Sequence, residues 1–212
     1  MAAAARKVVA AAALLIGCRG GCEEKVDQDR AGEIAATLWA GRSVEAGHRA
    51  ARVRFKIPAG LAPLQGVSNP NPAMLYEFSD QSPAGVGVAD GADRAMNSIV
   101  VYSDPEGLGV TIATRAEAAS APQVSGYLAM VRKRFEGASE GEVVEVGGRP
   151  ALRIDLPHVP LPNRPVRHGR HYLLFDQAAT ISVDCLWLTA EATWMSAACD
   201  EVAAGLTRVT TR

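Results

Sequence analysis

Apolar and polar residues alternate along much of this chain, which is the pattern of β-strands that bury one face. At residues 53–57, for example, Val53, Phe55 and Ile57 are separated by Arg54 and Lys56. Strands are predicted at residues 53–57, 74–78, 98–102, 108–113, 143–146, 149–156, 171–176 and 180–188. Short turns separate three neighbouring pairs, which we therefore expect to be antiparallel hairpins: 98–102 with 108–113, 143–146 with 149–156, and 171–176 with 180–188.

Two other segments repeat their apolar residues at helical spacing. The first covers residues 120–135, where Ser120 and Gln123 have the spacing of a capping box. The second covers residues 193–208. Their apolar stripes consist of Val124, Tyr127, Leu128, Val131 and Phe135 in the first, and of Met195, Cys199, Val202, Leu206 and Val209 in the second. Hairpins with one helix between them and another at the end predict an α+β fold, an antiparallel β-sheet with helices packed on it.

The first residues have the pattern of an export signal. Two basic residues precede an apolar run at residues 8–16, which is long enough for the core of a signal peptide and too short to span a bilayer. The run ends at residues 15–18 in Leu-Ile-Gly-Cys, which resembles the lipobox of bacterial lipoproteins. The resemblance implies that Cys18 takes a diacylglycerol after cleavage behind Gly17. The alternatives are an ordinary secretory signal, with residues 11–13 as its cleavage site, and a buried helix.

These features divide the chain into three parts. We expect a lipoprotein signal peptide at residues 1–17, a flexible tether with a possible short helix at 18–47, and an α+β domain at 48–212. Residue 19 is Arg, whereas Asp at this position favours retention in the inner membrane of many Gram-negative cells. The expected location is therefore the cell envelope, lipid-anchored, at the outer membrane and facing the periplasm. Cys22 has no assigned role.

Charge and motifs exclude several classes of function. Residues 1–17 contain two of the 22 basic residues and none of the 23 acidic ones, so the remainder has a net charge of 20 − 23 = −3. A nucleic-acid-binding protein would show a basic excess instead. The chain contains neither a Gly-x-Gly-x-x-Gly nor a Walker A motif. We expect no cofactor, and we expect that the protein is not an enzyme.

Cys185 and Cys199 are expected to form a disulfide. In the strand at 180–188, Cys185 shares a face with Ile181, Val183 and Trp187, and Cys199 lies on the apolar stripe of the last helix. Both sulfurs then point into the same layer. Two buried free thiols are the alternative, but an oxidising compartment favours the disulfide. Closing a loop of about fifteen residues contributes about 3 kcal/mol in the chain-entropy model.

Three of the four histidines, His158, His168 and His171, lie around a proline-rich stretch. Clustered imidazoles are potential zinc or copper ligands. An odd separation places residues 168 and 171 on opposite faces of an extended strand, however, and no second type of ligand is near in sequence. We therefore expect three surface histidines, no metal site, and only slight losses of stability when His168 or His171 is replaced by alanine.

Three segments resemble PsbP-like proteins. They are Phe-x-Ile-Pro-x-Gly-Leu at residues 55–61, Val-x-Val-Gly-Gly-x-Pro-Ala at 144–151, and Cys-Asp-Glu-Val at 199–202, after a strand cysteine. The resemblance covers residues 51–209 and implies an α/β/α sandwich around an antiparallel sheet. It transfers no activity, because members of this fold serve as photosystem accessory factors, as import factors and as lipoproteins of unassigned role.

The sequence thus predicts a membrane-anchored, exported lipoprotein that acts as a non-catalytic binding or accessory module of the cell envelope. Its expected partners are the lipid bilayer, through acylated Cys18, and an envelope protein or small ligand, but not nucleic acid. The alternative is an envelope hydrolase or a metal-binding protein that uses the region of His158, His168 and His171.

The anchor is testable by substitution. Cys18→Ser removes the thiol that accepts lipid, and each buried acyl methylene contributes about 0.8 kcal/mol of membrane affinity. We expect the variant to leave the detergent-rich phase in a phase-partitioning assay of whole-cell extract, while Cys22→Ser partitions like the unmodified protein. Equal partitioning of Cys18→Ser and the unmodified protein would exclude the lipid anchor.

Overall fold

The structure, a computed structural model, describes residues 37–46, 52–63, 85–89, 97–104, 107–159, 166–177 and 179–209. All of them belong to one compact unit, Gly32–Arg212. The predicted anchor residue Cys18, the unassigned Cys22, the proline-rich stretch at 160–165 and the strand expected at 74–78 lie outside the described residues.

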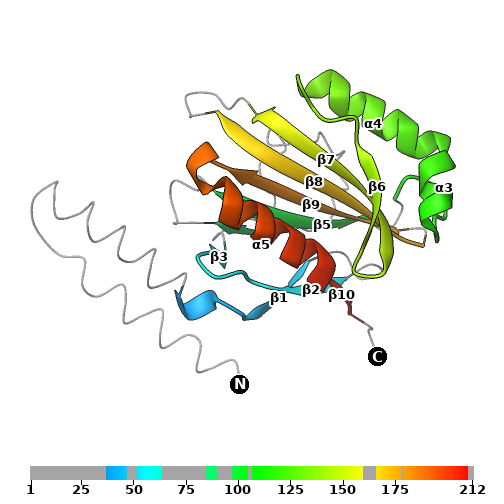
Figure 1. Ribbon diagram of the computed structural model, residues 1–212. Helices are drawn as coiled ribbons and strands as arrows, with labels where there is room; N and C mark the ends of the chain where they lie inside the picture. The colour runs from blue at the N-terminus through cyan, green and yellow to red at the C-terminus, as the bar shows by residue number, and fades with distance from the viewer. Residues whose placement is uncertain are drawn as a thin grey trace, which may run out of the picture. The chain divides into compact units, whose positions relative to one another are not determined.

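A seven-stranded antiparallel sheet forms the centre of this unit (Figure 1). Its strand order is β3-β4-β5-β9-β8-β7-β6. The strands are β3 (Ala62–Pro63), β4 (Gly85–Ala89), β5 (Ser98–Asp104), β6 (Glu142–Val146), β7 (Arg149–Val159), β8 (Arg167–Asp176) and β9 (Ala179–Trp187). A second, three-stranded sheet has the order β1-β2-β10 and consists of β1 (Ser43–Ala46), β2 (Val53–Lys56) and β10 (Thr207–Arg208). Sheets with helices packed on them confirm the predicted α+β fold.

Helices cover both faces of the large sheet, so the unit has two apolar cores. On one face, α5 (Ala192–Gly205) and the small sheet pack against Ile181, Val183 and Cys185 of β9. On the other face, α3 (Arg115–Ser120) and α4 (Pro122–Arg134) belong to a core that includes Leu152 and Leu173 of the sheet. Neighbouring side chains of one strand therefore enter different cores.

The first helical segment forms two helices, α3 and α4, where a single helix at residues 120–135 was expected. Thr114 and Glu117 form the observed capping box, at the start of α3, and residues 120 and 123 do not. Ala121 is extended, with φ −71° and ψ 122°, and separates α3 from α4. The cause is Pro122, because a residue that precedes proline is displaced from the helical region. Pro122 then takes the first position of α4, where its missing N–H costs nothing.

Two of the three expected hairpins are confirmed: β6 pairs with β7, and β8 pairs with β9. The third is wrong, because β5 pairs with β4 and β9 and not with residues 108–113. In that segment only Ile112 joins another strand, through an isolated bridge to Gln177. Strands β1, β3, β4 and β10 were not among the predicted elements.

The Cys185–Cys199 disulfide is confirmed, with 6.0 Å between the two Cα atoms. Both residues are completely buried in the core between β9 and α5. The covalent bond joins the middle of the last helix to the central strand of the sheet. It therefore fixes which face of α5 packs against that strand.

The turn between β6 and β7 contacts the C-terminal end of α5. Gly147 and Gly148 have φ values of +57° and +75°, which glycine adopts without strain. A Cβ atom on Gly147 would lie 2.4 Å from the backbone oxygen of Ala204, whereas one on Gly148 would meet nothing within 4 Å. The Arg149 Nη1 atom also donates to the Leu206 carbonyl at 3.0 Å, which places a cation at the negative end of the α5 dipole.

The two glycines provide a matched test of this close approach. Gly148→Ala should lower the free energy of unfolding by about 1–2 kcal/mol, because alanine is strained at positive φ. Gly147→Ala carries the same strain and also displaces α5, which should cost about 1–3 kcal/mol more. Urea unfolding at an unchanged m-value measures the difference. Equal midpoints for the two variants would show that the turn does not rest on α5.

Candidate functional site

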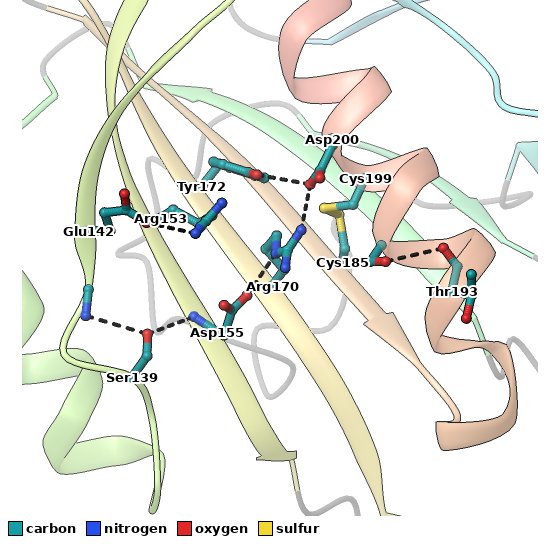
Figure 2. A network of polar contacts seen from close by, with 12 residues as sticks. Ser139, Glu142, Arg153, Asp155, Arg170, Tyr172, Cys185, Thr193, Cys199 and Asp200 are labelled. Atoms are coloured by element: carbon teal, nitrogen blue, oxygen red, sulfur yellow. Dashed lines mark hydrogen bonds and ion pairs between the residues drawn. A yellow bond between two sulfur atoms is a disulfide. The ribbon is translucent and has the colours of Figure 1, made fainter.

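The face of the sheet beside α5 carries a group of charged side chains on β6, β7 and β8 (Figure 2). Alternate residues of a strand point to the same face of the sheet. The charged residues of β7 and β8 therefore share the face of Ala151 and Leu174, which belong to the α5-side core. We call Glu142, Arg153, Asp155, Arg170, Tyr172 and Asp200 the charged face. Their neighbours in the α5-side core are apolar, and Asp200 of α5 meets Arg170 and Tyr172 beside that core.

Arg170 is the central residue of the charged face. Its Nε atom donates to Asp155 Oδ1 and its Nη1 atom to Asp200 Oδ1, both at 2.7 Å. The pairing of β7 with β8 places Asp155 directly opposite Arg170, while Asp200 comes from α5. The Arg170 side chain is 17% exposed, against 47% and 49% for its two partners. Burial alone lowers the pKa of the guanidinium, but the two carboxylates outweigh burial and raise its pKa above the usual value.

Two further contacts fix this network. The Tyr172 hydroxyl donates to Asp200 Oδ1 at 2.9 Å, and burial, together with Asp200, raises the pKa of that phenol. Arg153 Nη2 donates to Glu142 Oε2 at 2.7 Å, across the register of β6 and β7. The charged face therefore holds cations and anions side by side in fixed positions.

A Gly-x-Ser-x-Gly sequence lies beside this face at residues 137–141, and its pattern is that of the nucleophile elbow of α/β-hydrolases. Its local structure is different. An elbow lies between a strand and the following helix, whereas this segment runs from α4 to β6. The Ser139 Oγ atom accepts hydrogen bonds from the N–H groups of Asp155, at 2.9 Å, and Gly141, at 3.4 Å. Ser139 thus attaches the loop to β7, as Figure 2 shows.

Beneath α4, on the opposite face of the sheet, three polar side chains form a chain of hydrogen bonds. The Tyr127 hydroxyl lies 2.9 Å from His171 Nε2, and His171 Nδ1 makes a short contact with Asp184 Oδ1. His171 and Asp184 face each other in the register of β8 and β9. Both are buried, His171 completely. When Nδ1 donates to the Asp184 carboxylate, the other ring nitrogen, Nε2, accepts a hydrogen bond from the Tyr127 hydroxyl.

Asp184 also acts on a second tyrosine. Burial, and next the charge of Asp184, raise the pKa of Tyr102 above its usual value, because each disfavours a phenolate. Tyr102 lies on β5, which pairs with the other edge of β9. The carboxylate is therefore flanked by His171 on β8 and by a neutral phenol on β5.

The three histidines do not share a site. His171 was expected at the surface, and this expectation is wrong, because α4 covers the strand face to which its side chain points. His168 lies on the opposite face of β8 from His171, as predicted, with Nε2 2.8 Å from Thr189 Oγ1. His158 is exposed on β7. Within the described ranges, no three His, Cys, Asp or Glu side chains are placed to hold a metal ion together. The arrangement does not favour the metal-binding alternative.

Comparison with known proteins gives a resemblance of fold and no family. No protein-family model and no curated protein matches this sequence. Among solved structures, the chain is similar to cyanobacterial PsbP (CyanoP) from Synechocystis sp. PCC 6803, with 14% identity and a TM-score of 0.47 over 92% of this chain and 99% of that one. It is also similar to LpqN of Mycobacterium tuberculosis, a protein involved in cell envelope biogenesis, with 12% identity and a TM-score of 0.42 over 80% and 91% of the two chains.

A protein from Bacteroides thetaiotaomicron VPI-5482 is similar as well, with 9% identity and a TM-score of 0.41 over 74% of this chain and 45% of that one. In the part of the chain that the structure describes, no helix is both long and apolar enough to cross a membrane.

Substitutions along the buried chain should have graded effects on stability. His171→Ala leaves the buried Asp184 charge without its imidazole partner, which should cost about 3–5 kcal/mol. Tyr127→Phe removes one hydroxyl and should cost about 1 kcal/mol. His168→Ala, at a partly exposed position, serves as the control and should cost less than about 1 kcal/mol. Urea unfolding checks this order, and equal losses for the two histidine variants would contradict it.

Proposed function

We propose that this protein is an exported lipoprotein, anchored to a membrane through Cys18, whose domain acts as a non-catalytic binding module of the cell envelope. The charged face beside α5 is the proposed binding surface for an envelope protein. The observation that carries the proposal is the set of partly exposed, mutually paired charges that the disulfide-joined sheet and α5 hold in place.

The raised pKa values of Arg170 and Tyr172 support binding over catalysis. A general acid or base works best when its pKa lies near the working pH. The pKa values of Arg170 and Tyr172 are both raised from values that are already high, so Arg170 stays charged and Tyr172 neutral at physiological pH. Groups that do not change protonation state can still fix the orientation of a partner by complementary charge.

Ser139 gives the hydrolase alternative no support. Activation of a serine needs a base within hydrogen-bonding distance of its hydroxyl. The Ser139 Oγ atom accepts from backbone N–H groups, which donate and therefore cannot remove its proton. Its hydroxyl stabilises a turn instead.

Two features support an envelope location. Residues 15–18 resemble a lipobox, and the domain contains a buried disulfide, which persists in oxidising compartments outside the cytoplasm. The predicted side, the outer membrane facing the periplasm, is part of the same proposal. There the lipid would hold the domain near its partners, and the sheet would present the charged face to them.

Charge reversal on the charged face tests the proposal. After crosslinking in intact cells, the Arg153→Glu variant should co-purify with at least tenfold less of the partner than the unmodified protein does. Arg115→Glu, an exposed reversal on α3, is the matched control and should keep it.

A swap separates recognition from folding. The double variant Glu142→Arg/Arg153→Glu restores the ion pair within the protein and inverts only the pattern that a partner meets. It should fold normally and still lose the partner. Recovery of the same partner with the swap variant would rule out the charged face as the binding surface.

A further inference from the structure

The outward surface of α4 is basic and partly apolar. The three exposed residues of its last turn are Arg132, Lys133 and Arg134, and the helix sequence contains no acidic residue. Met130, one turn before Arg134, is 50% exposed, which makes it one of the most exposed large apolar side chains in the described part of the chain. No partner for this surface is given by the fold, because the inward face of α4 is the one that packs on the sheet.

Helical geometry places Lys133 and Met130 on the outward side of α4 and the two arginines on its flanks. Val124 and Val131 are its buried residues and mark the inward direction. At about 100° per residue, Lys133 points directly away from the sheet, and Arg132 and Arg134 diverge to its two sides. Met130 lies between Lys133 and Arg134 in this projection. A surface that approaches α4 would therefore meet Lys133 and Met130 first, and the long side chains of Arg132 and Arg134 would extend to it from the two flanks.

The helix dipole explains only part of this arrangement. Cations in the last turn interact favourably with the helix C-terminus, and this is a common reason for their presence there. The dipole does not account for the exposed methionine beside them. Glu136, an exposed carboxylate two residues after Arg134, leaves residues 132–136 with a net charge of +2.

We propose that the outward surface of α4 docks the domain onto an anionic lipid bilayer. This inference rests on the proposed lipid anchor, which keeps the domain beside a membrane. Charge complementarity favours a bilayer as the partner of this surface, because a bilayer that contains anionic lipids attracts clustered Lys and Arg residues. The side chain of Met130 is suited to enter the interface between headgroups and acyl chains.

The chain length permits this docking. Eighteen residues, 19–36, lie between Cys18 and Thr37, the first residue that the structure describes, and a chain of that length spans at most about 60 Å. A chain of that length would allow the domain to turn its α4 side toward the bilayer that holds the anchor. Since α4 and α5 cover opposite faces of the large sheet, docking through α4 turns the charged face away from the membrane.

Binding to vesicles tests this proposal without the acyl chains. The probe is the chain from residue 18 onward with Cys18→Ser, which keeps the whole compact unit Gly32–Arg212. We expect it to sediment with vesicles of phosphatidylglycerol and phosphatidylethanolamine at low ionic strength, and not with vesicles of phosphatidylcholine. Raising the salt should release it, because salt screens exposed charges.

Matched variants locate the surface. Arg132→Gln/Lys133→Gln should weaken partitioning about 30-fold, since each cation near an anionic surface contributes about a factor of five. Arg42→Gln/Lys56→Gln removes the same charge from exposed positions near the small sheet and should have little effect. Equal losses in the two double variants, or no binding of the unmodified probe to anionic vesicles, would overturn the docking proposal. Neither result bears on the anchor, which the partitioning of Cys18→Ser decides separately.

Discussion

Strand β9 is buried on both faces, and most of the structure follows from how its side chains are accommodated. Residues that alternate along it enter two different cores, so every polar residue of the strand needs a partner within the protein. Asp184 finds one in His171 of the adjacent strand, and through it the Tyr127 phenol of α4. One position further along, Cys185 points the other way and bonds covalently to α5. The central strand thus has a polar link to one helical layer and a covalent link to the other.

Local pattern predicted those parts of the fold that depend on neighbours in sequence. The hairpins β6–β7 and β8–β9 have strong alternation and short turns, and the disulfide followed from the face on which each cysteine lies. The small sheet was missed because β2 pairs with β10, whose residues come from the far end of the chain. Strand β4 was missed because its glycines break the alternation of apolar and polar residues.

The candidate site shows a different limit of sequence pattern. His171 was assigned to the surface because a polar residue beside a proline-rich stretch, at the start of a strand, was expected to face solvent. That expectation holds for strands with one solvent-exposed face. Strand β8 is covered on both faces, and even Arg167 is buried. The charged face was not predicted either, because its members come from β6, β7, β8 and α5 and meet only after folding. The signal that was present, Ser139 within Gly-x-Ser-x-Gly, points to chemistry that its hydrogen bonds do not support.

The two helical layers differ in how firmly they are attached. α5 is held by a disulfide, by the ion pair of Asp200 with Arg170, and by Arg149 at its C-terminus. α4 is held by apolar contacts and by the phenol of Tyr127. Cooperative units of one protein can open with very different free energies. The α4 layer is therefore the part of this domain that can separate from the sheet while the rest stays folded. Such local opening would expose the Asp184–His171 pair to water while the charged face on the other side keeps its shape.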